Sequence, residues 1–267
     1  MLEGYRRFEF DLDQDGVLHV EMVGASAINA VDEIMHTELS RLWYDIDAQP
    51  DVRAVILTGR GDNFSGGGDL DFIVDMTESQ EMRTRVMGEG RRIVTGLLDL
   101  RVPLVSALHG SCVGAGLISG LLADVSVAGH NAMLMDAHTR VGLVAGDHSA
   151  VVWPLLCGMA KAKYRLLVND PLSGKEADEI GLVSLSVPDA EVRERAAAIA
   201  RKLAVGAPSA IQWTKQALNM WLRQALPAFE TGLALEFVGL GGPEPREGVA
   251  ALQEKRRPDF RTMEMPR

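Results

Sequence analysis

Along the first half of the chain, segments in which apolar residues have the spacing of a strand alternate with segments in which they have the spacing of a helix. Residues 8–22 read FEFDL, a DQDG turn and VLHVEMV with alternating side chains, a pattern that predicts a β-hairpin. Residues 31–50 carry apolar side chains at helical spacing, and the nearly continuous apolar run over 52–59 predicts a strand covered on both faces. Strands that alternate with helices indicate an α/β fold. The order continues with helices expected over 82–100 and 115–122 and strands over 102–110 and 124–129.

The last third of the chain changes to helical spacing throughout, in stretches that cover residues 191–206, 209–226 and 227–240. We therefore expect two domains, a core over residues 1–205 and a C-terminal helical region over residues 206–267. The second region carries more apolar surface than a solvated tail needs. This surface packs either on a neighbouring subunit or on the protein's own core, and the pattern leaves both alternatives open. Its largest side chains are Trp213, Trp221 and Phe237.

Composition and charge exclude two classes of partner. The 267 residues carry a formal net charge of −10, whereas a protein that binds nucleic acid needs a basic face. No apolar run reaches about 18 residues without a charge or a turn, so we expect no membrane span. Both cysteines, Cys112 and Cys157, lie in apolar contexts, and residues 1–10 lack the apolar core of a signal peptide. These features predict a cytoplasmic protein with reduced cysteines.

Two glycine-rich junctions each follow a predicted strand and precede a helical pattern. The first, residues 57–70, reads LTGRGDNFSGGGDL, and the second lies within ALHGSCVGAGLISGLLADVSVAG at residues 107–129. Glycine lets backbone N–H groups approach a ligand closely, and a helix start favours negative charge. No lysine follows the first set of glycines, so that junction is not a P-loop. The first junction alone is equally well a structural turn, but two junctions that face one point would form an oxyanion hole.

These two stretches resemble the signatures of the crotonase superfamily, the enoyl-CoA hydratase/isomerase family. Residues 52–70 are similar to the first signature and residues 107–129 to the second, and two later landmarks read KEADEIGLVSLSVP and REGVAALQEKRRPDF. The resemblance covers essentially the whole chain. It implies an α/β crotonase-type spiral of ββα repeats with a C-terminal helical trimerisation region, assembled as a homotrimer or a dimer of trimers.

The resemblance also implies an acyl-CoA thioester as the substrate, with coenzyme A as part of that substrate and no separate cofactor or metal. By position, the backbone N–H groups of Gly68 and Ala115 are the expected oxyanion-hole donors. Alanine replaces the usual glycine at position 115, which keeps the N–H group. Four further residues are expected to line the substrate site, namely Gly67, Asp69, Ile118 and Trp153.

Two departures from the family pattern conflict with the usual hydration mechanism. Hydratases of this family use two glutamates, one as a base toward water and one as an acid at the α-carbon. Here the first glutamate position falls on Ile118 and the second falls on His138. The acid–base groups must therefore come from elsewhere in the chain, or the protein is a non-catalytic acyl-CoA binder.

A polar stretch at residues 135–154, MDAHTRVGLVAGDHSAVVWP, offers replacement groups. His138 and Asp147 beside an oxyanion hole suit general base and acid, because histidine titrates near neutral pH. Asp147 would need burial to raise its pKa if it is to donate a proton. The alternative is a surface loop with scattered polar groups. Zinc binding is not expected, since the histidine spacing fits no zinc-ligand template and no cysteine is near.

The same stretch is similar to a C–C bond hydrolase branch of the superfamily, the branch of 6-oxocamphor hydrolase. That branch has a histidine at the position of His138, an aspartate in the context of Asp147 and a histidine at the position of His36. Ala115 replaces a third histidine of that branch, and the intact SGGGDL loop favours a thioester substrate.

We therefore expect hydration or double-bond isomerisation of an enoyl-CoA, with His138, Asp147 and His36 as the catalytic residues. Hydrolytic C–C cleavage of a β-dicarbonyl compound, which does not need coenzyme A, is the alternative. Glu236 lies in a predicted C-terminal helix, where an ordinary helix acid is the favoured interpretation and a reach into the site is the other.

Overall fold

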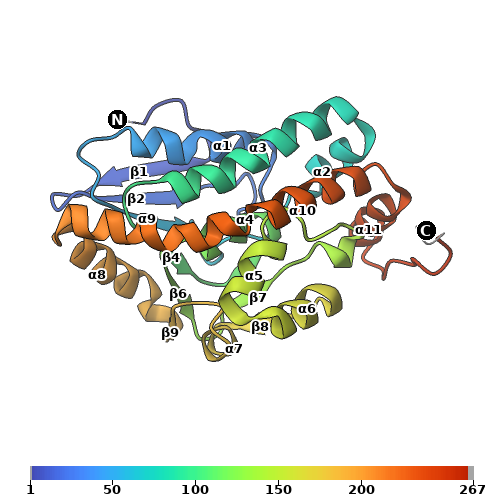
Figure 1. The fold of residues 1–267 in the computed structure, drawn as a ribbon. Coiled ribbons are helices and arrows are strands. Elements are labelled where there is room, and N and C mark those ends of the chain that lie inside the picture. The colour runs from blue at the N-terminus through green and yellow to red at the C-terminus, as the bar shows by residue number, and fades with distance from the viewer. Residues whose placement is uncertain (1, 264–267) are drawn as a thin grey trace.

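A six-stranded sheet forms the centre of the computed structural model, which describes residues 2–263 (Figure 1). The strand order is β1-β2-β3-β4-β6-β9. β1 and β2 pair antiparallel across a short turn, which confirms the hairpin, and all later neighbours in this sheet pair in parallel. The strands are β1 (Phe8–Leu12), β2 (Val17–Met22), β3 (Ala54–Gly59), β4 (Leu104–Leu108), β6 (Val125–Gly129) and β9 (Leu185–Val187).

A second sheet of three short strands accompanies the first. β5 (Ser111–Val113) pairs in parallel with β7 (Met133–Met135), and β7 pairs antiparallel with β8 (Leu172–Ser173). The chain visits the two sheets in turn, passing from β4 to β5, through helix α4 (Gly114–Leu121), and then from β6 to β7. From β4 to β7 each turn of the chain thus adds one strand to each sheet, as the expected spiral of ββα repeats requires.

The apolar run at β3 is continuous because the large sheet is covered on both faces. Val55 and Leu57 join the main core cluster with side chains of α1 (Glu33–Asp47) and α3 (Gln80–Asp99). Ala54 and Ile56 point the other way, into a second cluster with α8 (Val192–Ala204). Figure 1 shows α1 and α3 on one side of the sheet and α8 on the other. Successive side chains of a strand alternate in direction, so both faces need apolar residues.

The sequence pattern did not predict the helices between residues 149 and 179, namely α5 (Ser149–Cys157), α6 (Met159–Val168) and α7 (Gly174–Glu179). α5 begins within the polar stretch at residues 135–154 and contains Pro154, which normally argues against a helix interior. The predicted helices are present, with ends displaced by one to several residues. The other bounds are α2 (Leu70–Glu78), α9 (Pro208–Gln224), α10 (Leu226–Gly239) and α11 (Pro243–Gln253), with 3₁₀ turns at Thr139–Val141 and Asp189–Glu191.

The apolar surface of the C-terminal helices is partly buried against the protein's own core and partly exposed. α9 and α10 lie against α3, and Phe229 and Leu233 of α10 belong to the main core cluster. Trp213 and Trp221 of α9 instead remain 66% and 67% exposed. Residues 264–267 of the expected C-terminal domain lie outside the described residues. Within residues 2–263, none of the helices combines the length and the hydropathy needed to span a bilayer.

Candidate active site

The two glycine-rich junctions meet in the folded chain. Ser65 of the first junction donates its N–H to Ser111 O (2.9 Å), and Val113 of the second donates its N–H to Ser65 O (3.0 Å). Gly116 allows this approach, because a Cβ at that position would collide with Ser65 Oγ. Gly67 has φ 93°, a conformation that favours glycine. The structure therefore joins the two turns into one backbone assembly, as the oxyanion-hole interpretation requires.

The backbone N–H groups of Gly68 and Ala115 are the free donors of this assembly. Both residues line a cleft with about 960 Å³ of empty space, part of it open to solvent. Within the described residues neither N–H has a hydrogen-bond acceptor, and Ala115 lies in the first turn of α4, where helical N–H groups have no partner. Two free N–H groups on one wall can stabilise negative charge on a carbonyl oxygen.

The other residues expected at the substrate site divide into two groups. Gly67 and Ile118 line the cleft. Asp69 instead caps α2, where its carboxylate accepts the N–H groups of residues 71 and 72. Trp153 is fully buried in the main core cluster. Neither Asp69 nor Trp153 is among the lining residues of the cleft, so both act in this structure as supports of the fold.

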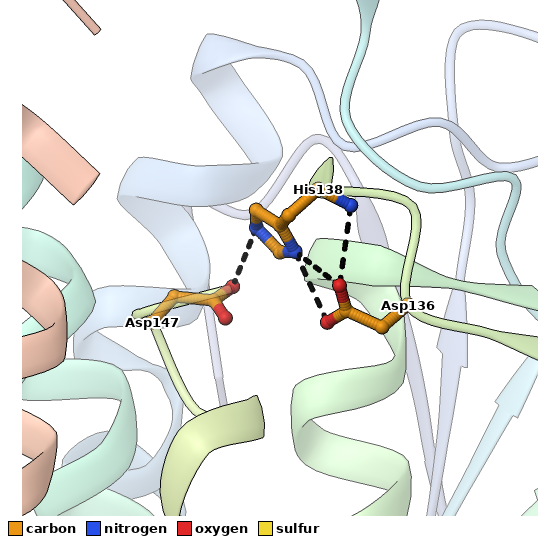
Figure 2. Close-up of side chains that lie close together, drawn as sticks. All are labelled: Asp136, His138 and Asp147. Carbon is orange, nitrogen blue, oxygen red and sulfur yellow. Dashed lines mark hydrogen bonds and ion pairs between the residues drawn. The ribbon is translucent and has the colours of Figure 1, made fainter. Parts of the chain in front are cut away.

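His138 lies between two carboxylates, those of Asp136 and Asp147, as Figure 2 shows. Its Nδ1 is 3.0 Å from Asp136 Oδ1, and its Nε2 is 3.6 Å from Asp147 Oδ2. The other oxygen of Asp147 accepts the backbone N–H of His148 at 2.7 Å and contacts His148 Nδ1 at 2.6 Å. His138 and Asp147 both line the cleft and are more than nine-tenths buried. The surface-loop interpretation is therefore wrong.

The protonation states of this cluster differ from the simplest expectation. Burial lowers the pKa of His138, but the charges of Asp136 and Asp147 outweigh burial and hold that pKa well above its usual value. Burial raises the pKa of Asp147, but His148 and His138 outweigh burial and hold that pKa below its usual range. Asp147 is thus buried, yet it remains a carboxylate. This shift argues against Asp147 as a proton donor. Because a lowered pKa also weakens the carboxylate as a base, a role as proton acceptor rests on its place in the cleft beside His138.

Glu236 is a functional candidate that the sequence pattern ranked too low. Its Oε1 lies 3.7 Å from His138 Nε2, and its buried Oε2 has no hydrogen-bond partner in the described chain. Burial and the charge of Asp147 raise the pKa of Glu236 well above its usual value, a shift that favours the neutral carboxylic acid. A sequence signal existed, because Glu236 follows the buried Phe229 and Leu233 by seven and three residues, which places all three on one helical face.

His36 reaches the cleft from the first helical turn of α1, and its ring lies against Phe72. Its Nδ1 is 2.8 Å from Oε2 of Glu89, a buried acid of α3 that also pairs with Arg85 at 2.9 Å. Burial raises the pKa of Glu89, but His36 and Arg85 outweigh burial and lower it. Sequence reasoning named His36 and missed Glu89, because nothing local in α3 marks an acid whose partner lies 53 positions earlier.

Asp136, His138 and Asp147 are also potential metal ligands, with ligand atoms within 4.8 Å of one another. Figure 2 shows, however, that the two carboxylates face opposite nitrogens of the imidazole ring. A single ion needs its ligand atoms directed at one point. The arrangement therefore fits a chain of proton-transfer groups better than a coordination site.

Comparison with known proteins shows which family the chain belongs to. The family model of the enoyl-CoA hydratases and isomerases matches residues 13–263. The chain belongs to the enoyl-CoA hydratase/isomerase family. A crystal structure of an enoyl-CoA hydratase/isomerase from Mycobacterium paratuberculosis is 30% identical and superposes with a TM-score of 0.87, covering 91% of this chain and 97% of that one. The spiral described above is thus the crotonase fold.

Two further relatives of this enoyl-CoA hydratase/isomerase family member differ in chemistry. The 1,2-epoxyphenylacetyl-CoA isomerase of Escherichia coli is 28% identical over 92% of this chain and 95% of its own length. The beta-diketone hydrolase of the cyanobacterium Anabaena is 31% identical, with a TM-score of 0.82 over 89% of this chain and 95% of that one. The family includes both kinds of enzyme, so membership alone does not assign the reaction.

Proposed function

We propose that this enzyme hydrates or isomerises an enoyl-CoA thioester through an enolate, without the two glutamates of the usual mechanism. One observation carries the proposal: the two free N–H groups of Gly68 and Ala115 share a cleft with His138, Asp147 and Glu236, and the pKa values of the two carboxyl groups are shifted in opposite directions. Donors that hold the thioester oxygen polarise the double bond, and the other groups move protons.

In the hydration direction, Asp147 serves as the base. A water molecule attacks the β-carbon of the enoyl thioester and passes one proton to the Asp147 carboxylate. The π electrons of the double bond shift toward the thioester oxygen, and the resulting enolate is held by the N–H groups of Gly68 and Ala115. The enolate then takes a proton at its α-carbon from the neutral Glu236, which restores the thioester. One water molecule has been added; Asp147 now holds a proton and Glu236 has lost one, so a proton must pass from Asp147 to Glu236 before the next turnover.

His138 returns that proton. Its Nε2 lies 3.6 Å from Asp147 and 3.7 Å from Glu236, so one imidazole edge faces both carboxyl groups. The imidazolium gives its Nε2 proton to the Glu236 carboxylate and takes the proton held by Asp147, while Asp136 keeps the Nδ1 edge in place. These distances exceed those of hydrogen bonds, and such contacts often shorten when substrate binds. Isomerisation uses the same groups, with a substrate C–H proton replacing the water proton.

We expect the rate to fall on the alkaline side. The reaction requires neutral Glu236, and an acid with a raised pKa loses its proton only as the pH rises through that raised value. It also requires ionised Asp147, whose lowered pKa keeps the carboxylate charged into the acid range. Glu236→Gln should lower kcat/KM by about 10–10²-fold and displace the alkaline limb of the pH profile. An unchanged profile in this variant would remove Glu236 from the mechanism.

The direct test is loss of absorbance of the conjugated thioester when an enoyl-CoA is mixed with the enzyme. We expect turnover, with a 3-hydroxyacyl-CoA or a displaced double bond identified by mass spectrometry and NMR. Acyl-CoA binding without turnover at any chain length would support a non-catalytic binder. The absence of both binding and turnover would reject the thioester altogether.

Hydrolytic cleavage of a β-diketone is the second candidate, favoured by the similarity to the Anabaena hydrolase and by the placement of His36, His138 and Asp147 around one cleft. Ala115 and the intact glycine loop support the thioester instead, because they leave two backbone donors free. Incubation with a cyclic β-diketone in the absence of coenzyme A separates the two, since only the hydrolase opens the ring.

Assembly and location are also proposals. We infer a homotrimer or a dimer of trimers, because the exposed Trp213 and Trp221 leave an apolar face on α9 that a second copy would cover. A cytoplasmic location is supported by the two cysteines, which are free thiols in the structure.

A further inference from the structure

Helix α3 contains two glycines that neither backbone geometry nor packing requires, Gly88 and Gly90, and only Gly90 lines the cleft. Glycine is disfavoured in a helix interior relative to alanine, so its presence calls for a reason. Gly96 has one, because a Cβ there would lie 3.0 Å from the Tyr44 ring and 3.2 Å from Trp43 Cβ. Gly90 does not: its φ is not positive, and an added Cβ would meet only Leu233 Cδ1, at an ordinary contact distance of 3.5 Å.

The space beside Gly90 belongs to the cleft. Gly90 is buried and lines it, one helical turn after Val86, which lines it too. The wall formed by α2, α3 and α10 is apolar around this point. The charged neighbour Glu89 is held by His36 and Arg85. The apolar side chains of this wall are Leu70, Phe72, Ile73, Met76, Val86, Leu233 and Phe237.

We propose that the space beside Gly90 receives the distal part of the acyl group, and that Gly90 sets the upper limit on its size. The substrate class is then an enoyl-CoA whose apolar acyl chain extends well beyond four carbons. This inference rests on the proposed thioester function. A side chain at position 90 would fill the space that the missing Cβ leaves, and the distal carbons would lose their place against the apolar wall.

Gly90→Leu tests the proposal against crotonyl-CoA, with four acyl carbons, and trans-2-octenoyl-CoA, with eight. We expect kcat/KM for the octenoyl substrate to fall about 10-fold or more, because loss of the apolar contacts of even one methylene lowers kcat/KM by about this factor. The crotonyl value should stay within about 3-fold of wild type, which also reports that the variant folds. Gly90→Ala should give an intermediate loss.

Gly88→Leu is the matched control. Gly88 lies two positions earlier in the same helix, is only partly buried, does not line the cleft, and a Cβ there meets no atom within 4 Å. This variant should leave the rates for both substrates unchanged. Equal losses for both substrates in Gly90→Leu, or no loss in either, would overturn the size limit.

Binding separates this inference from the proposed function. Titration calorimetry with butyryl-CoA and octanoyl-CoA applies even to an enzyme that turns over neither probe. Weaker octanoyl-CoA binding in Gly90→Leu, with butyryl-CoA binding retained, supports the inference without any reaction. Equal affinities of the variant and the wild type for octanoyl-CoA overturn it while leaving the thioester function intact. Failure of the wild type to bind either probe overturns both.

Discussion

Exchange of Asp147 for asparagine is expected to lower kcat on an enoyl-CoA by about 10²-fold or more. Asparagine nearly preserves the volume of the side chain and can still accept the backbone N–H of His148, but it cannot take a proton from water. His138→Ala should cause a loss of the same order, because it removes the group that faces both carboxyl groups. Stopped-flow or steady-state loss of the conjugated thioester absorbance measures both variants.

Two controls make this result specific. Asp75→Asn changes an exposed acid of α2 and should leave kcat at the wild-type value. Calorimetric affinity for a saturated acyl-CoA should be little changed in Asp147→Asn, since the carboxylate acts on protons and does not hold the thioester. Near-wild-type rates in both Asp147→Asn and His138→Ala would contradict the proposed acid–base pair and would return attention to His36 and Glu89.

Ala115→Pro is expected to lower kcat by about 10²–10³-fold, the usual effect of losing one oxyanion donor. Proline removes the backbone N–H group that the proposal places on the thioester oxygen. The change is compatible with the fold, because Ala115 lies in the first turn of α4, where proline costs no helical hydrogen bond. The preceding Gly114 has no Cβ to collide with the ring.

Ala115→Gly provides the matched control for the proline variant. It keeps the N–H group and should retain kcat within about 3-fold, since it removes only a methyl group from the cleft wall. Circular dichroism and thermal unfolding of both variants report whether α4 is intact. A proline variant that folds and retains wild-type kcat would show that position 115 does not donate to the reacting oxygen.

Much of the fold could be predicted from local patterns. The hairpin of β1 and β2, the doubly covered strand β3 and the helices α1, α3 and α4 all follow from apolar periodicity and turn residues. α5 was missed because its sequence is apolar on nearly all sides and contains Pro154, so it has no amphipathic period to detect. Exact helix ends were missed by one to several residues, since they depend on capping contacts with the rest of the chain.

The part of the candidate site that consists of backbone N–H groups could be predicted from the sequence. Glycines at the two junctions indicate N–H groups that can approach a ligand, and the structure brings the junctions together through hydrogen bonds of residues 65, 111 and 113. Trp153 and Asp69 were assigned to the substrate site by resemblance, whereas the structure places the first in the core and uses the second as a helix cap. A match of sequence position does not show whether a side chain points into the cleft or away from it.

The sequence by itself determined most of the alternation of strands and helices before residue 130, the two glycine-rich junctions and the absence of glutamate at positions 118 and 138, because these depend on periodicity, backbone freedom and residue identity. Only the tertiary structure decided in which direction the pKa of each buried acid is shifted. Asp147 and Glu236 are both buried carboxyl groups, yet His148 lowers the pKa of the first, while burial beside Asp147 raises that of the second. A pKa depends on charges within a few ångströms, and here those charges come from segments as much as about 100 residues apart.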